Sequence, residues 1–167
     1  MSPPEGSSVT FRRVPASLRR TAIERFARRL QNEVAQGARF DTLIAGDTEL
    51  RRLNRDFRKK DYATDVLSFP IEKAGPIEKA GPIEKAGLVE ETELRLGDLA
   101  ISLGRARAQA REFGHTVERE IQILMLHGVL HLMGHDHEID RGRMARAEKR
   151  WRAKLGLPAC LIERVQS

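Results

Sequence analysis

The stretch HGVLHLMGHDH, residues 127–137, decides how the rest of this chain is organised. It contains four of the chain's five histidines. His127 and His131 are separated by one helical turn, so on a helix both side chains lie on the same face. Gly134 follows, and glycine is the usual residue where a helix ends with positive φ. A chain that turns at this glycine brings His137 back toward the other two histidines.

Three converging imidazoles that leave a fourth position for water are typical of catalytic zinc. The spacing H-x-x-x-H-x-x-G-x-x-H matches the metzincin ligand pattern, except that Gly128 replaces the general-base glutamate of those peptidases. A single histidine on an apolar helix is often only a hydrogen-bonded core residue, but three at this spacing are harder to explain in that way. The sequence therefore predicts one Zn²⁺ ion held by His127, His131 and His137.

Two neighbours of these histidines have open roles. Asp136 is a direct ligand, a partner that orients a histidine ring, or a capping residue, and the last two roles are favoured. His135 lies between ligand positions and adds a further nitrogen near the predicted metal. The proton acceptor of any reaction at this site is not identified by the sequence; Asp136, His135 and a metal hydroxide are candidates.

The size and composition of the chain predict one globular domain. It has 167 residues, of which 40% are hydrophobic and 32% are charged. Cys160 is the only cysteine, which excludes an internal disulfide and favours a reducing compartment. The polar N-terminus lacks the pattern of a secretory signal, and the apolar segment 121–133 is too short to span a bilayer. We therefore expect a soluble protein in the cytoplasm.

The positive charge is concentrated in the first third of the chain. The formal net charge is +6, yet between Phe11 and Lys60 there are 14 Lys/Arg against 6 Asp/Glu. Such a basic region suits a polyanion, because lysine and arginine neutralise phosphates. A solvated helix face on a basic protein would have the same composition. The predicted metal site in the same small domain favours a nucleic-acid substrate.

Hydrophobic periodicity predicts strands mixed with helices. Residues 1–8 are expected to form a disordered tail, residues 9–158 a single catalytic metal-dependent domain, and residues 159–167 a C-terminal tail. Strands are predicted near 9–14, 40–45, 64–69 and 94–101, and helices near 17–37, 47–57, 102–113, 116–133 and 140–155. Asp47 is the expected N-cap of the second helix, whose Phe57 is expected to face inward. The predicted class is α+β, a small mixed sheet packed with about five helices, of which the buried central one carries the metal ligands.

An insertion interrupts the domain at residues 70–87. Pro-Ile-Glu-Lys-Ala-Gly occurs there three times without a break. Proline and glycine in every unit exclude a continuous helix. The segment is either a binding arm or a tandem expansion of a surface loop, and the second interpretation is favoured because lengthening a loop costs little free energy.

These motifs together resemble those of the YbeY family of bacterial endoribonucleases, also described as rRNA maturation factors. The histidine stretch at 127–137 carries the resemblance most clearly, with His135 in place of the family's common tyrosine. The segments NRDFR (54–58) with TDVLSFP (64–70), and GDLAIS (97–102), are similar as well. The triple repeat has no expected counterpart in the family, where this connection is normally shorter.

The resemblance implies an α+β fold in which His127, His131 and His137 hold zinc and Arg58 lies in the cleft as the functional arginine. Arginine offers a permanently charged planar fork that suits a phosphodiester. The implied function is a zinc-dependent, single-strand-specific endoribonuclease acting in maturation of the small-subunit rRNA 3′ end and in ribosome quality control. The implied partners are single-stranded rRNA, the small ribosomal subunit and assembly factors, with no membrane.

Two other functions stay open at this point. One is a metal-dependent hydrolase of another class, such as a peptidase, although Gly128 argues against it. The other is a ribosome-assembly binding factor whose zinc is only structural. An open fourth coordination position would argue against the second, but the sequence alone does not show whether that position is open.

Overall fold

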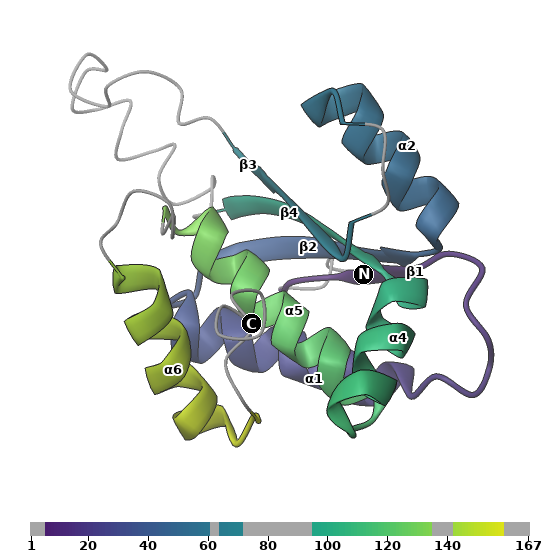
Figure 1. The fold of residues 1–167 in the computed structure, drawn as a ribbon. Coiled ribbons are helices and arrows are strands. Elements are labelled where there is room, and N and C mark those ends of the chain that lie inside the picture. The colour runs from purple at the N-terminus through teal and green to yellow at the C-terminus, as the bar shows by residue number, and fades with distance from the viewer. Residues whose placement is uncertain (1–5, 61–63, 72–94, 135–141, 159–167) are drawn as a thin grey trace, which may run out of the picture.

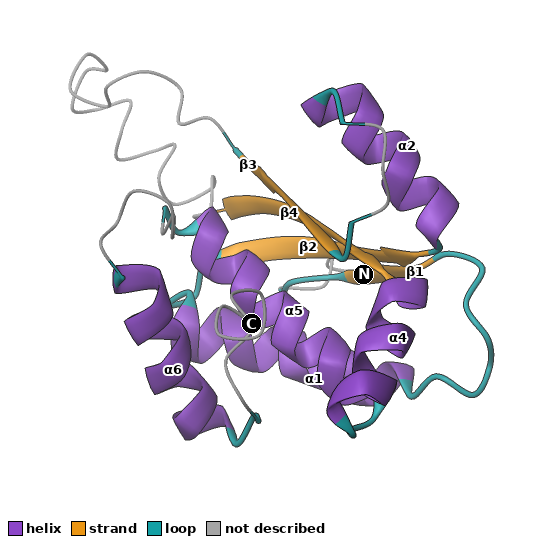
Figure 2. Ribbon diagram, in the orientation of Figure 1, coloured by secondary structure: helices purple, strands orange, loops and turns teal. Residues whose placement is uncertain are grey.

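The computed structural model describes residues 6–60, 64–71, 95–134 and 142–158, and shows one sheet with helices on both of its faces (Figures 1 and 2). The repeat beyond Ile71, the segment 135–141 and the predicted C-terminal tail lie outside the described residues. The strands are β1 (Val9–Phe11), β2 (Arg39–Ala45), β3 (Val66–Pro70) and β4 (Arg95–Ser102). The helices are α1 (Arg20–Arg29), a π-helical segment (Leu30–Val34), α2 (Asp47–Arg58), α4 (Leu103–Phe113), α5 (Val117–Leu132) and α6 (Arg143–Leu155).

The sheet is mixed, with the strand order β1-β2-β4-β3. β1 and β2 are parallel, as are β2 and β4, whereas β3 runs antiparallel to β4. β3 is therefore an edge strand, and its residues pair with β4 from Val66 opposite Ile101 to Pro70 opposite Gly97. Successive side chains of a strand point to opposite faces, so β3 and β4 contribute to the packing on both sides of the sheet.

The main core lies between the sheet and the helices α1, α4, α5 and α6, which are below the sheet in Figure 1. α5 is buried on most sides and packs beneath β3 and β4. Leu99 and Ile101 of β4 point into this core. An element that is apolar almost all round belongs in the middle of a fold, and the structure confirms the predicted buried central helix.

A second, smaller apolar cluster occupies the other face of the sheet, under α2 (Figure 1). Leu50 and Leu53 of α2 pack there against Leu67 and Ala100 of the sheet. α2 is polar on its outer side, where most of its arginines are exposed. The sheet therefore separates α2 from α5, and β3 is the strand that borders both layers at the open edge.

Side-chain caps define the starts of α4 and α5, which lie where the sequence predicts helices to begin. The hydroxyl oxygens of Ser102 and Thr116 accept hydrogen bonds from the backbone N–H groups of Arg105 and Arg119, each at 3.1 Å. Gly114 ends α4 with a φ of 71°.

Two details of the predicted helices are corrected. The helix expected over 17–37 is regular only from Arg20 to Arg29, after which the chain follows a wider π-helical path. Asp47 is the first residue of α2 rather than its N-cap, because Gly46 holds the capping position. The Asp47 carboxylate instead accepts a hydrogen bond from the Ser102 hydroxyl, which links the starts of α2 and α4.

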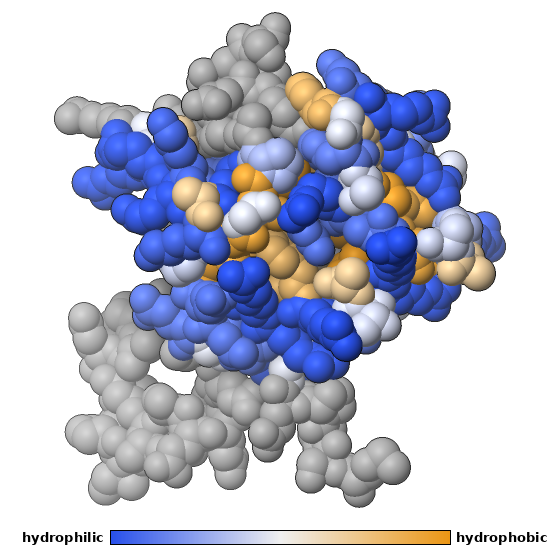
Figure 3. Space-filling view, turned by 90° about the horizontal axis from the view of Figure 1, so that it is seen from below, coloured by the Kyte–Doolittle hydropathy of each residue, from blue (hydrophilic) through white to orange (hydrophobic). Residues whose placement is uncertain are grey.

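The arrangement confirms the predicted α+β class with a small mixed sheet. Seen from below, the helical side shows mostly hydrophilic side chains around an interrupted band of hydrophobic ones (Figure 3). Ser7, in the predicted tail, is buried and hydrogen-bonded to Gln31. Within the described ranges, no helix combines the length and the apolar character that a membrane span requires.

Candidate metal and nuclease site

His127 and His131 lie one above the other near the C-terminal end of α5, as their spacing predicts. Their Nε2 atoms are 3.1 Å apart, and their ring centroids are 4.6 Å apart with the rings inclined by 68°. Two nitrogens that share a tetrahedral zinc ion lie about 3.3 Å apart, given Zn–N distances of about 2.0–2.1 Å. The distance between the two Nε2 atoms is therefore close to that between two ligands of one metal ion, and it also suits a hydrogen bond between the two rings.

Glu148 on α6 contacts the other nitrogen of His127. Its Oε2 atom lies 3.3 Å from Nδ1 of His127, and its side chain is completely buried. Arg152, one turn later and also buried, places Nη1 3.5 Å from the second carboxylate oxygen. A carboxylate that accepts the Nδ1 proton fixes the imidazole tautomer and leaves Nε2 as the electron-pair donor. The contact therefore prepares His127 to bind a cation through Nε2.

The sequence analysis did not identify Glu148, although a signal was available. Glu148 follows Ala147 and lies one turn after Met144, so it falls on the stripe of α6 that packs inward. A glutamate on an apolar stripe needs a buried partner. That partner could not be identified from the sequence, because α5 and α6 are brought together only by the tertiary fold.

Gly128, beside His127, lies where α5 packs directly against the sheet. A Cβ atom added at this position would lie 2.6 Å from Cδ2 of Leu99 on β4. On β3, the Ser68 hydroxyl donates a 3.4 Å hydrogen bond to the Gly128 carbonyl oxygen. The position at which the metzincins carry their general base is thus filled by the Leu99 side chain, which would have to shift to admit a glutamate side chain.

The third predicted ligand, His137, lies outside the described residues, as do His135 and Asp136. Among the residues that the structure describes, no group of three histidine, cysteine or acidic side chains is arranged to hold a metal ion. Of the predicted ligands, the structure describes His127 and His131, and it adds Glu148 as the partner of His127.

Arg58 is the last residue of α2 and is exposed. Lys59 follows in the left-handed conformation, with a φ of 59°, and ends the helix. Arg58 is on the α2 side of the sheet, whereas His127 and His131 are on the α5 side, and no hydrogen bond within the described ranges joins them.

Phe57 corrects one expectation. Predicted to face inward, it is 66% exposed, and its ring meets that of Phe69 on β3 edge-on at a centroid distance of 5.5 Å. The apolar stripe of α2 ends one turn earlier, at Leu53, because the small second core is already closed by Leu50, Leu53 and Phe69. The last turn of α2 therefore extends beyond the smaller apolar cluster against which the rest of the helix packs.

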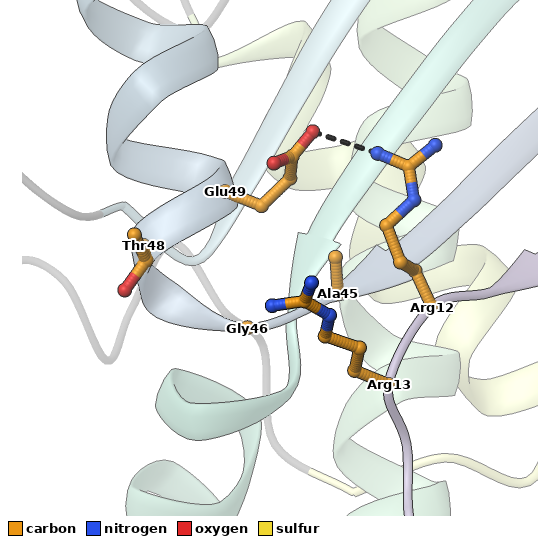
Figure 4. A pocket seen from close by; sticks show the side chains of 6 residues that line it. All are labelled: Arg12, Arg13, Ala45, Gly46, Thr48 and Glu49. Atoms are coloured by element: carbon orange, nitrogen blue, oxygen red, sulfur yellow. Dashed lines mark hydrogen bonds and ion pairs between the residues drawn. The ribbon is translucent and has the colours of Figure 1, made fainter.

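A separate pocket lies at the opposite end of α2 (Figure 4). Arg12 and Arg13, on the loop after β1, face the start of the helix at Gly46. Nη1 of Arg12 donates a 2.8 Å hydrogen bond to Glu49, and a hydrogen bond from Arg52 is the main reason that the pKa of Glu49 is lowered. The pocket is thus basic at its rim, but part of its charge is neutralised within the protein.

Comparisons with known proteins agree with this architecture. A family model described as Endoribonuclease YbeY matches residues 10–156. The chain is 75% identical over 167 residues to the Endoribonuclease YbeY of Solibacter usitatus (strain Ellin6076), covering all of both chains. It is 41% identical over 149 residues to that of Koribacter versatilis (strain Ellin345), covering 89% of this chain and 86% of the relative.

A likeness in fold is also found. The solution structure of a Thermotoga maritima protein matches with a TM-score of 0.53 and 24% identity, covering 86% of this chain and 85% of that one. The resemblance inferred from the motifs is confirmed, and with it the predicted enzyme class, because the matched family is one of endoribonucleases. The chain belongs to the endoribonuclease YbeY family.

Proposed function

We propose that this chain is a zinc-dependent, single-strand-specific endoribonuclease that acts in the cytoplasm on the 3′ end of small-subunit rRNA and in ribosome quality control. His127, His131 and His137 hold one Zn²⁺ ion in this proposal, and Arg58 binds the phosphate that is cleaved. The small ribosomal subunit and its assembly factors are the proposed partners. The single observation that carries the metal site is the 3.1 Å approach of the two Nε2 atoms on α5.

The donor set fits zinc. Neutral imidazole nitrogens are preferred ligands of this ion, and three protein ligands leave one position open for chemistry. The hydrogen bond between His127 and the buried Glu148 is the type of outer contact that accompanies metal-bound histidines. A bound zinc ion supplies Lewis acidity toward a phosphoryl oxygen and a place where water is activated near neutral pH.

The protein side chains have separate tasks in this proposal. Glu148 holds the Nδ1 proton of His127, so that Nε2 of that ring keeps its electron pair for the metal. Arg58 supplies a fixed positive charge where negative charge grows on the phosphate. The space beside His127 is closed to a glutamate base by Leu99, which argues against a peptidase.

The charge distribution supports a polyanionic substrate. Arg58, Lys59 and Lys60 are consecutive and exposed, and no acidic side chain of the described residues forms an ion pair with them. Arg12 and Arg13 add a second basic group at the other end of α2. Phosphate contacts of this kind make binding steeply dependent on salt.

The test is cleavage of an unstructured RNA by purified protein with zinc, with and without a chelator. Chelation and His131→Ala are each expected to abolish cleavage while circular dichroism stays unchanged. Arg58→Ala is expected to lower the cleavage rate about a hundredfold, the size of effect seen when one donor to a developing charge is removed.

Arg55→Ala is the matched control, since Arg55 lies one turn earlier on the same helix and pairs with Asp56 at 3.5 Å. It is expected to leave cleavage nearly unchanged. Full cleavage by the chelated protein would refute the metal-dependent mechanism. Unfolding on chelation, without any RNA cleavage before it, would support a structural metal instead.

A further inference from the structure

We propose that Phe57 and Phe69 form a stacking platform that takes one unpaired base of single-stranded RNA. This inference rests on the proposed function and names the feature that makes it specific for single strands. The platform lies where α2 passes over the edge strand β3. Neither ring belongs to the main core, and Phe69 packs against the smaller apolar cluster.

The exposure of Phe57 is the first observation. Its side chain is 66% exposed, more than that of any other large hydrophobic residue among those described. Burial of an aromatic ring normally contributes to stability in proportion to the apolar area removed from water. Because most of Phe57 stays exposed, its ring contributes little to the stability of the fold in this way. An edge-to-face contact covers at most one face of a ring, so the contact with Phe69 leaves another face of Phe57 open.

The charge around the platform is the second observation. Asp56 is turned toward the preceding helical turn, where its oxygens lie 3.7 Å from Nη1 of Arg52 and 3.5 Å from Nε of Arg55. Arg58, Lys59 and Lys60 follow Phe57 directly and have no acidic partner in the described part of the chain. An aromatic surface beside unneutralised cations is the combination that binds a base together with its flanking phosphates.

The position of the platform relative to the histidines is the third observation. Phe69 points to the α2 side of β3, and the preceding residue, Ser68, donates a hydrogen bond to the carbonyl oxygen of Gly128 on the α5 side. Gly128 directly follows His127 in α5. Because β3 is the edge of the sheet, an RNA strand can pass from one side to the other over it without crossing another described strand.

The occupant is a base that is not paired. A base within a duplex is covered on both faces by its neighbours, so it cannot stack on a protein ring without being extruded. Every base has a π-face, and a stacking platform therefore discriminates between unpaired and paired RNA without selecting a sequence. The platform gives the enzyme a physical reason to prefer single strands.

The test measures RNA binding without cleavage, by fluorescence anisotropy of a short labelled unstructured RNA in the presence of a chelator. Phe57→Leu keeps an apolar side chain but removes the π-face, and is expected to weaken binding about tenfold. Phe57→Trp is expected to restore or strengthen binding. Phe113→Leu is the matched control, because Phe113 is also exposed but lies at the end of α4; it is expected to bind like the wild type.

A second RNA with the same backbone but without bases separates stacking from charge. Phe57→Leu and the wild type are expected to bind this abasic strand equally. Equal binding of the intact RNA by Phe57→Leu and the wild type would overturn the platform. This is the result expected if Phe57 and Phe69 contact a protein instead of RNA. An equal loss on both RNAs would also overturn it.

The proposed nuclease function is judged separately, from cleavage by the zinc-loaded wild-type protein. If that protein cleaves RNA while Phe57→Leu binds normally, the platform fails and the function stands. If it does not cleave RNA but binding still depends on Phe57, the function fails and the platform stands.

Discussion

Oε2 of Glu148 lies 3.3 Å from Nδ1 of His127, and the Nε2 atom of the same imidazole faces His131. One ring thus connects a buried carboxylate on α6 with the histidine pair on α5. The carboxylate is itself compensated by Arg152, so the whole group is held by charge and hydrogen bonding inside the protein. The orientation of His127 is set by this partner as well as by the helix that carries it.

Replacing Glu148 is expected to weaken metal binding without removing a ligand. Glu148→Gln keeps the size of the side chain and an acceptor oxygen but removes the negative charge. We expect the zinc dissociation constant to rise at least about tenfold, as is typical when the partner of a metal-bound histidine is changed. Competition with a chromophoric chelator measures this. Glu112→Gln, on the exposed side of α4, is the control, and an unchanged affinity in Glu148→Gln would contradict the role assigned to the carboxylate.

A side chain at Gly128 is expected to destabilise the fold. In Gly128→Ala the new methyl group meets Leu99, which is buried in the main core, and the cost is about 1–3 kcal/mol of unfolding free energy. Urea unfolding measures it. Adding Leu99→Val should recover part of the loss, because it shortens the side chain that is hit. Gly6→Ala is the control, since a methyl group there would make only an ordinary contact, 3.6 Å from Oε1 of Gln31. A Gly128→Ala protein as stable as the wild type would show that α5 can move away from the sheet.

Asp41 is expected to make stability depend on pH in the acid range. Burial alone would raise its pKa, but hydrogen bonds from Ser8 and Arg95 outweigh burial and lower it. A lowered folded-state pKa stabilises the protein above the unfolded-state value of about 4, and this contribution is lost as the pH falls through the folded-state pKa.

Asp41→Asn should therefore cost about 0.5–1 kcal/mol at pH 7, a modest value because Asp41 and Arg95 are both partly exposed. The difference between the two proteins should vanish in strong acid. Urea titrations at both pH values check this. A difference that is the same at both would mean that the Asp41 charge is not what stabilises the fold.

The Pro-Ile-Glu-Lys-Ala-Gly repeat is expected to be dispensable. Pro70 pairs with Gly97 in the antiparallel β3–β4 ladder, so the two ends that the insertion connects are neighbours in the sheet. A much shorter connection can join them, and loop length changes the closure entropy only slowly. Deleting two of the three units should leave thermal unfolding and RNA cleavage nearly unchanged. A large loss of RNA affinity in the shortened protein would instead identify the insertion as a binding arm.

Local sequence signals predicted much of this structure. The helices α4 and α5 begin where the pattern predicts, because helix starts depend on local signals such as the capping hydroxyls of Ser102 and Thr116. The two helical histidines could be paired from spacing alone. The third ligand and the role of Arg58 stay predictions, since His137 lies outside the described residues and the structure forms no contact between Arg58 and the described histidines.

The features that the sequence did not predict depend on contacts between distant segments. Glu148 was missed because its partner lies on another helix. The prediction that Phe57 lies in the core is wrong, because the helical periodicity of α2 continues beyond the end of the sheet surface against which the helix packs. Glycine is needed at position 128 because of the contact between α5 and Leu99 of β4, which the sequence alone does not show. Hydrophobic periodicity indicates which side of a helix or strand is apolar, but it does not indicate how far the surface that packs against that side extends.

The place of Glu148 on α6 has a consequence for how the enzyme matures. α6 follows α5 in the chain and therefore leaves the ribosome after it during synthesis. A nascent chain already contains both helical histidines before their carboxylate partner has emerged. In the proposed function, tight capture of the metal therefore requires that α6 has been synthesised and has packed against α5, so the nuclease is activated only after these two helices have met.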